Sequence, residues 1–283
     1  MIIKAVQQFQ LGTVMNNEKE VRNTLQLMKE AGYDGIELCG FMIRPSGLMV
    51  KLLTKAAGMP IGKGGNLDWQ SLVSEYGLKV VSLHEDMGRL EKETRAVIEE
   101  AHAFQTNYIV LTGMYGYDYS DADKVKDLAH RLNAVGKQLA AEGISLLYHN
   151  HNVELTRVAP GMTAYDLLMQ ELDPAYVNFE FDSYWMTDAG ANTAAIMQKL
   201  GSRMKLWHIN DRGPKKSGRA VTPIVACDSR ELGYGCMDLQ TLSQIAIANG
   251  VEAIILESHR NWAEKSPIKS FQLSAEFLKK LER

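Results

Sequence analysis

Residues 142–154 have the sequence EGISLLYHNHNVE, and this segment contains one complete example of the pattern that predicts the fold. Gly143 follows a long helical pattern and marks the point at which that helix should end. The apolar run Ile144–Tyr148 then fits a short buried strand, which finishes in histidines. Helix, glycine, apolar strand and polar strand end form the repeating unit of a parallel α/β protein.

The same unit recurs from one end of the chain to the other. Glycine also follows helical patterns at Gly32, Gly77 and Gly250, a few residues before the next apolar run. Eight apolar runs alternate with eight helical patterns, and no Pro/Ser-rich linker or composition shift divides them. We therefore predict an α/β protein, a (β/α)8 TIM barrel forming a single domain over residues 1–283. A doubly wound open sheet is the alternative, but the Gly-rich nucleotide loop expected after its first strand is missing.

The expected elements have approximate bounds. The strands are predicted at Lys4–Phe9, Gly35–Leu38, Lys79–Leu83, Tyr108–Leu111, Ile144–Tyr148, Val177–Phe181, Lys205–His208 and Ala253–Leu256. The helices are predicted at Glu18–Ala31, Asp68–Tyr76, Lys92–Phe104, Asp121–Glu142, Thr163–Glu171, Thr193–Leu200, Leu239–Asn249 and Ser266–Leu281. Two long insertions, Phe41–Asn66 and Asp211–Met237, follow strand ends, where barrels build active sites; variable surface loops are the alternative.

The composition is that of an ordinary globular protein with a sizeable core, because 46% of the 283 residues are hydrophobic and 23% are charged. A formal charge of -3 argues against a nucleic-acid or membrane partner. The 3 cysteines are too few and too scattered for a disulfide framework. The first residues lack the pattern of a secretory signal, and no apolar run is long enough to span a membrane. We expect a cytoplasmic protein.

Five strand ends carry charged or imidazole side chains, although buried parallel strands are normally apolar. They are His84 with Glu85, His149 with His151 and Glu154, Asp182, His208 and Glu257. In a closed barrel these strand ends would meet at one mouth, where carboxylates repel one another unless a cation compensates them. A mixed carboxylate and imidazole shell suits Mn, Co, Zn, Mg or Fe. We therefore predict a bound divalent metal cation, although a lone strand-end histidine is more often a hydrogen-bonded core residue.

Motifs at successive strand ends also resemble those of a known family. They are HNHNVE, FDSYW, KLWHIND, ELGYGCMD and ILES, in this order. Together they are similar to the xylose-isomerase-like TIM barrel superfamily, which includes sugar phosphate isomerases/epimerases, inosose dehydratases and relatives of endonuclease IV. The resemblance implies a divalent metal held by Glu, Asp, His and Glu from strands five to eight. Asp182, His208 and Glu257 match the last three positions.

The fifth strand departs from that family pattern. His149 stands where many epimerases have a metal-binding glutamate that also transfers a proton. We favour Glu154 as the fourth ligand, with His149 or His151 as the acid/base, and His149 as the ligand is the alternative. This difference from the family pattern argues against a simple epimerase mechanism that uses two glutamates.

The predicted function is that of a divalent-metal-dependent isomerase/epimerase acting on a keto sugar, sugar phosphate or cyclitol through an enediolate intermediate. Imidazole and carboxylate groups can remove the C–H proton near neutral pH, and His151, His149 and Glu257 are the candidates. The candidates for substrate binding are His84, Trp185, Glu37 and Asp211. Glu37 could instead form a salt bridge in the barrel mouth, and Asp211 could cap a helix or loop.

Three other functions remain open. A metal-dependent dehydratase or lyase acting on a keto-glycoside or inosose shares the same first step and is favoured by the histidine-rich fifth strand. A DNA-repair endonuclease would need more metal ligands and a basic face, and a catalytically silent sugar-binding barrel is the third alternative. The expected partner is a small carbohydrate or cyclitol. The resemblance also implies a possible homo-oligomer.

Overall fold

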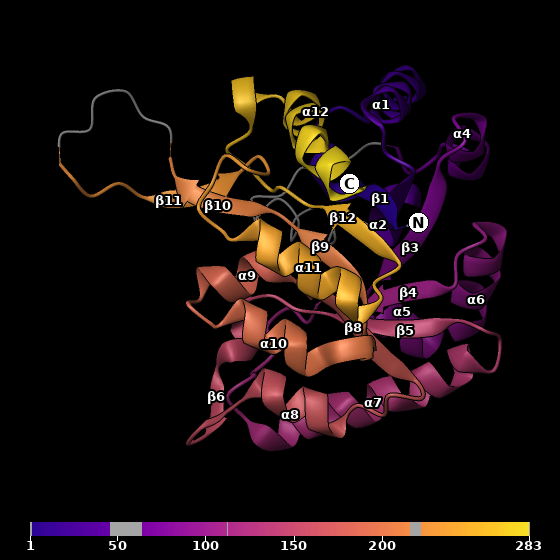
Figure 1. The fold of residues 1–283 in the computed structure, drawn as a ribbon. Helices are drawn as coiled ribbons and strands as arrows, with labels where there is room; N and C mark the ends of the chain where they lie inside the picture. The colour runs from indigo at the N-terminus through magenta and orange to yellow at the C-terminus, as the bar shows by residue number, and fades with distance from the viewer. Residues whose placement is uncertain (1, 46–63, 112, 216–221, 283) are drawn as a thin grey trace. The chain divides into compact units, whose positions relative to one another are not determined.

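The structure is a computed structural model that describes residues 2–45, 64–111, 113–215 and 222–282. Eight strands close into a barrel in the order β1–β12–β9–β8–β5–β4–β3–β2 (Figure 1). Their bounds are β1 Ile3–Gln7, β2 Gly35–Cys39, β3 Lys79–Glu85, β4 Tyr108–Leu111, β5 Ser145–His149, β8 Val177–Asp182, β9 Met204–Ile209 and β12 Ala253–Leu256. The neighbours β1–β2, β3–β4, β4–β5, β5–β8 and β8–β9 pair in parallel. The predicted (β/α)8 barrel is confirmed.

The chain divides into two compact units. Unit 1 consists mainly of Val80–His208 and Gln244–Ala253, and unit 2 of Ile3–Lys79, Ile209–Ser243 and Ile254–Arg283. A single domain over residues 1–283 stays a prediction. Within the ranges that the structure describes, no helix combines the length and the apolar character needed to cross a membrane.

Unit 1 carries the helices that follow β3 to β8. They are α5 Met87–Lys92, α6 Thr94–Ala103, α7 Ala122–Ala140, α8 Ala164–Glu171, α9 Ser183–Asp188 and α10 Thr193–Leu200, with the short strands β6 Arg157–Ala159 and β7 Met162–Thr163. Helices α7 and α8 pack side by side (Figure 1). Asp121 caps the start of α7 and Thr163 caps α8 through a capping box, which satisfies amides that have no partner within the helix.

The alternation of side chains along β8 decides which of them belong to the polar face. Phe179 and Phe181 pack against the ring of Tyr165 on α8, with centroid distances of 5.6 and 6.4 Å. Glu180 and Asp182 are one residue out of phase with the two phenylalanines, so they point to the opposite face of the sheet. Both carboxylates are buried there.

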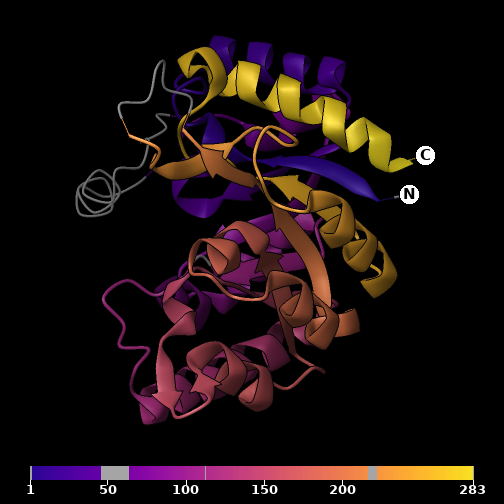
Figure 2. The same cartoon turned by 60° about the vertical axis from the view of Figure 1, so that its left-hand side comes forward.

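Unit 2 carries the first and the last helices of the chain. They are α1 Glu18–Ala31, α2 Gly40–Ile43, α4 Trp69–Glu75 and α12 Pro267–Leu278, and α11 Leu239–Asn249 begins in this unit and ends in unit 1. Helix α12 lies beside α1 in both ribbon views (Figures 1 and 2). The hydroxyl of Tyr33 donates to the carbonyl oxygen of Phe271 at 2.8 Å and joins the end of α1 to α12. Asn17 caps α1, and Ser266 caps α12, whose first residue is Pro267.

Five short 3-10 helices complete the described elements. They are η1 Gln8–Leu11, η2 Val153–Leu155, η3 Gly201–Arg203, η4 Ala263–Lys265 and η5 Lys279–Glu282. The first of them shortens the predicted strand Lys4–Phe9, because the side chain of Gln7 accepts a hydrogen bond from the Phe9 amide and begins η1. The strand therefore ends at Gln7.

The two predicted insertions differ in what the structure describes. Most of Phe41–Asn66 lies outside the described residues, since 46–63 are not among them. The insertion Asp211–Met237 contains the antiparallel strands β10 Asp211–Pro214 and β11 Cys227–Arg230, while 216–221 lie outside the described residues. A two-stranded sheet therefore supports part of the segment that follows β9.

Candidate metal centre

Three buried histidines of unit 1 contact one oxygen atom, Oε1 of Glu180. Nε2 of His84 and Nδ1 of His149 lie 2.9 Å from this oxygen, and Nε2 of His208 lies 3.1 Å from it. Glu180 is 0% exposed, and no histidine of the group is more than 4% exposed. We call these four residues the imidazole cluster. It brings together the ends of β3, β5 and β9 around a side chain of β8.

Contacts between the rings hold the imidazole cluster in place. His84 stacks on His208, with a centroid distance of 5.7 Å and an interplanar angle of 24°. His149 meets His84 and His208 edge-on, at 5.3 and 4.7 Å. In a close-packed interior, such contacts restrict the rotation of the rings.

The donor atoms of this region fit a divalent cation. One possible ligand atom from each member of the imidazole cluster lies within 4.8 Å of the others, and His149, Asp182 and His208 form an overlapping set with the same spacing. A buried carboxylate needs compensation from hydrogen bonds or a cation. Imidazole nitrogen and carboxylate oxygen are ligands that Zn, Mn, Co and Fe accept. The residues present therefore suit such an ion.

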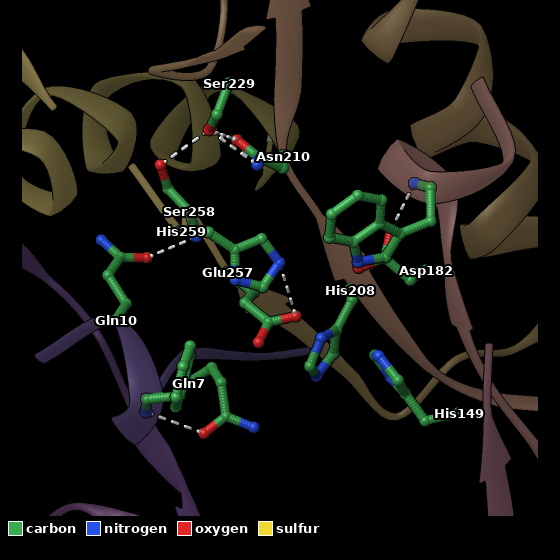
Figure 3. A network of polar contacts seen from close by, with 12 residues as sticks. Gln7, Gln10, His149, Asp182, His208, Asn210, Ser229, Glu257, Ser258 and His259 are labelled. Atoms are coloured by element: carbon green, nitrogen blue, oxygen red, sulfur yellow. Dashed lines mark hydrogen bonds and ion pairs between the residues drawn. The ribbon is translucent and has the colours of Figure 1, made fainter. Parts of the chain in front are cut away.

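Asp182 is held in position from two sides. Its Oδ1 accepts a hydrogen bond from the Trp185 amide at 3.0 Å and so caps α9 (Figure 3). Its main chain exchanges two hydrogen bonds of 3.0 Å with the Asn150 amide group. Asn150 is the residue after β5, so these bonds fix the ends of β5 and β8 relative to each other.

His151 is the partly exposed imidazole beside the buried ones. Its ring lies 4.9 Å from that of His149 and 5.9 Å from that of Trp185, measured between centroids. Gly113 approaches it closely, because a Cβ atom there would lie 3.2 Å from Cε1 of His151, and the φ of Gly113 is +124°. A glycine with this backbone conformation leaves room for the imidazole.

The structure does not bring Glu154 together with the other predicted ligands. Its Oε1 accepts a hydrogen bond from the hydroxyl of Tyr148 at 2.8 Å, and its Oε2 accepts one from the His151 amide at 2.9 Å. The hydroxyl of Tyr148 in turn contacts that of Tyr119 at 2.9 Å. Burial raises the pKa of Glu154, and the bonds from Tyr148 and the His151 amide oppose this shift. Among the described residues, both sets of possible ligand atoms contain His149 and neither contains Glu154.

The remaining predicted site residues belong to unit 2. Glu257 is buried, its amide donates to the Ile209 carbonyl at 3.2 Å, and its Oε2 lies 3.8 Å from Nε2 of His259 (Figure 3). Glu37 accepts a hydrogen bond of 2.6 Å from the side-chain amide of Gln7. Its predicted substrate contact stays a prediction.

Asp211 caps a loop. Its carboxylate accepts hydrogen bonds from the amides of Arg212, Gly233, Gly235 and Met237, over distances of 2.8 to 3.2 Å. A Cβ atom on Gly235 would lie 2.2 Å from Oδ1 of Asp211, so this close approach requires glycine. These contacts support the loop-cap alternative.

A second polar network in unit 2 holds the residue after Glu257. The amide of Ser258 donates to Oε1 of Gln10 at 2.8 Å, and its hydroxyl contacts that of Ser229 at 2.9 Å (Figure 3). Ser229 also contacts the side chain of Asn210. The backbone that follows Glu257 is thereby tied to η1 and β11.

Sequence reasoning missed Glu180. The signal was present, because Glu180 is two residues before Asp182 in a strand and therefore shares its face. It also missed His259, which follows Glu257 by two residues and whose ring lies 6.0 Å from that of Phe9.

The fold is a TIM barrel, and buried histidines and carboxylates lie close together at its strand ends. This arrangement is that of a barrel suited to metal binding. The chain matches the xylose isomerase-like TIM barrel over residues 25–281 and belongs to that family. The predicted family membership is confirmed.

Individual relatives agree with this family. The chain is 26% identical over 193 residues to the inosose dehydratase of Clostridium beijerinckii, a match covering 65% of this chain and 63% of that protein, under two thirds of its length. A sugar phosphate isomerase/epimerase of Parabacteroides distasonis has a TM-score of 0.77 and 22% identity, covering 99% of this chain and 98% of that one. The IOLI protein with a bound zinc atom has a TM-score of 0.67 and 15% identity, covering 99% and 98%. Both likenesses show the fold.

Proposed function

We propose that the protein is a divalent-metal-dependent isomerase or epimerase acting on a keto sugar, sugar phosphate or cyclitol. The observation that carries this proposal is a buried set of imidazoles and carboxylates beside a partly exposed imidazole, His151. Relatives that are sugar isomerases/epimerases and inosose dehydratases support it. We also propose a cytoplasmic location, and a homo-oligomer stays a prediction.

Asp182, His208 and Glu257 are the proposed metal ligands, with His149 in place of Glu154 as the fourth. The close spacing of His149, Asp182 and His208 supports three of these assignments. The assignment of Glu257 rests on the sequence. Glu257 comes directly after β12, just as Asp182 is the last residue of β8 and His208 lies one residue before the end of β9. A cation bound there would stabilise the negative charge that develops on a carbonyl oxygen when a neighbouring C–H proton is removed. The zinc atom of the IOLI protein supports an ion of this kind.

His151 is the proposed base. Its imidazole is partly exposed, so a substrate can reach it, and an imidazole can take a proton at its unprotonated ring nitrogen near neutral pH. Trp185, half-buried beside it, offers an apolar surface to the C–H face of a sugar. Glu257 is the candidate for returning the proton. His149, buried against Glu180, suits metal binding better than proton transfer.

A dehydratase or lyase acting on a keto-glycoside or inosose is the second candidate. His149 stands at the position of the glutamate expected in a two-glutamate epimerase, and the Clostridium beijerinckii relative is an inosose dehydratase. Expulsion of a β-hydroxyl or glycosidic oxygen would follow the same removal of a C–H proton. The two candidates therefore differ in product and share the first step.

Deuterium uptake from D2O, followed by NMR, tests the shared step. Keto sugars, keto-glycosides and inososes would be incubated with the protein and Mn, and then with a chelator. We expect metal-dependent exchange at a carbon next to the carbonyl, and the product distinguishes isomerase, epimerase and lyase. Absence of exchange across the panel, with bound metal verified, would contradict the proposal and favour a non-catalytic barrel. Incision of abasic-site DNA would favour an endonuclease.

A further inference from the structure

We propose that Glu180 is a positioning residue that sets the tautomers of His84, His149 and His208 and does not itself bind the metal. This inference rests on the proposed function and deepens it, because it specifies which ring nitrogen of each ligand faces the cation. It concerns residues of unit 1 only.

The contacts with Oε1 of Glu180 determine the position of each ring proton. A carboxylate oxygen without a proton accepts hydrogen bonds and donates none. With Glu180 as the acceptor, each ring nitrogen that faces Oε1 at 2.9 to 3.1 Å would carry the ring proton: Nε2 of His84, Nδ1 of His149 and Nε2 of His208. A neutral imidazole has one N–H, so its lone pair is on the other nitrogen.

That assignment leaves the lone pair of each ring on the nitrogen farther from Glu180, where His149 and His208 could bind the cation. His149 would bind through Nε2 and His208 through Nδ1. Histidines that bind metals commonly donate their second ring N–H to a carboxylate, which fixes the orientation of the ring and raises its basicity. Glu180 would supply this carboxylate to two ligands and to His84.

The sheet register explains how one carboxylate reaches several rings. His149 of β5 pairs directly with Glu180 of β8, and Asp182 of β8 pairs directly with His208 of β9. Asp182 is two residues closer to the end of β8, which is about 6.6 Å along a strand. Glu180 thus lies farther from the C-terminal end of β8 than Asp182 does, and it contacts the rings from within the strand.

The alternative is that Glu180 is a ligand, with the cation among the nitrogens that face it. The short spacing of the imidazole cluster is compatible with both arrangements. They differ in one observable, because a cation beside Glu180 would bind Nδ1 of His149 and Nε2 of His208. The coordinating nitrogens therefore decide between them.

Nitrogen-15 NMR of the histidine side chains in the whole protein is the test, first metal-free and then with Zn²⁺. We expect the metal-free protein to carry the proton on Nδ1 of His149 and on Nε2 of His84 and His208. Zn²⁺ should then shift Nε2 of His149 and Nδ1 of His208. The opposite tautomers, or Zn²⁺ on the nitrogens that face Glu180, would overturn the proposal.

Zn²⁺ affinity, measured by chelator competition, provides a second readout. Glu180→Gln keeps the size of the side chain but presents an amide donor to rings that need an acceptor, so we expect affinity to fall 10- to 100-fold, roughly the effect of losing such a partner. Glu85→Gln is the matched control, because Glu85 is a buried β3 glutamate that pairs with Arg89 at 2.7 Å. It should change affinity less than about twofold. Equal affinities of Glu180→Gln and the wild type would overturn the proposal.

The two readouts separate this inference from the proposed function. If the wild type binds neither Zn²⁺ nor Mn²⁺, the proposed function fails, while the tautomers of the metal-free protein still test the role of Glu180. If Zn²⁺ binds and exchange occurs but the tautomers are reversed, only the inference about Glu180 fails.

Discussion

Two buried glutamates of unit 1, Glu180 and Glu154, have different surroundings although neither is more than 1% exposed. Neighbouring residues of β5 contact one each: His149 contacts Glu180, and Tyr148 contacts Glu154. Glu180 faces imidazoles, whose nitrogens can bind a cation. Glu154 faces a hydroxyl and a backbone amide, which stabilise a carboxylate within the fold. The partners of a buried acid, more than its burial, indicate its role.

Loss of a proposed metal ligand should give the largest effect. Asp182→Asn and His208→Ala should each weaken metal binding by more than about 100-fold, since even the loss of an outer partner costs about 10- to 100-fold. Glu154→Ala should retain the metal. Elemental analysis after dialysis measures the occupancy of all three variants. Full occupancy in both ligand variants, or its loss in Glu154→Ala, would reverse the comparison.

Glu154→Ala should instead destabilise the fold. The substitution removes the acceptor of the Tyr148 hydroxyl and of the His151 amide, and an unsatisfied buried donor costs about 1–3 kcal/mol. We expect the free energy of unfolding to fall by about 2–4 kcal/mol in urea denaturation. Glu154→Gln should lose less, because its amide can accept from the His151 amide and donate to Tyr148. A loss below about 0.5 kcal/mol in Glu154→Ala would show that these bonds contribute little.

The pH dependence of stability should show a smaller effect of the same residue. Burial raises the pKa of Glu154 above its ordinary value of 4.5, so the folded state holds this proton more tightly than the unfolded state. Ionisation of Glu154 therefore lowers stability as the pH rises from about 4.5 through the raised pKa, and this penalty is absent in more acidic solution. The free energy of unfolding of Glu154→Gln, minus that of the wild type, should increase with pH across this range in metal-free protein. A difference that stays constant or decreases would contradict this sign.

The smallest effect is expected at Tyr119, whose hydroxyl contacts that of Tyr148, the hydrogen-bond donor to Glu154. Tyr119→Phe removes one buried hydroxyl that contacts Tyr148, so we expect a loss of about 1 kcal/mol in thermal or urea unfolding. Metal affinity should not change, because the hydrogen bond lost in this variant joins Tyr119 to Tyr148 and does not involve a residue of the imidazole cluster. A large loss of metal affinity would mean that the contact between Tyr119 and Tyr148 affects the proposed metal site.

Most of the fold follows from the sequence, because local periodicity determines it. The strand at Tyr108–Leu111 and the helix at Glu18–Ala31 have the predicted bounds, since their apolar patterns and their caps agree. The paired strands β10 and β11 were not predicted, because the sequence between them, residues 215–226, is longer than the two to five residues of the loops that indicate a hairpin.

The candidate site was less accessible to sequence reasoning. His149, Asp182 and His208 could be predicted as neighbours from their places at strand ends. The choice between His149 and Glu154 could not be made, because it depends on how Tyr148 and the His151 amide fold around Glu154. Glu180 was missed because the prediction considered the polar residues at the ends of the strands, such as Asp182. Glu180 is two positions before Asp182 and therefore lies on the same face of β8.

The most direct test of the proposed site is deuterium exchange by His151→Phe beside the wild type. His151 is proposed to move the substrate proton and not to bind the metal. We predict that the variant keeps the metal content of the wild type and loses at least about 100-fold in metal-dependent exchange, the typical contribution of a general base. Exchange at the wild-type rate in a fully metal-loaded His151→Phe protein would contradict the proposed role of His151 as the base.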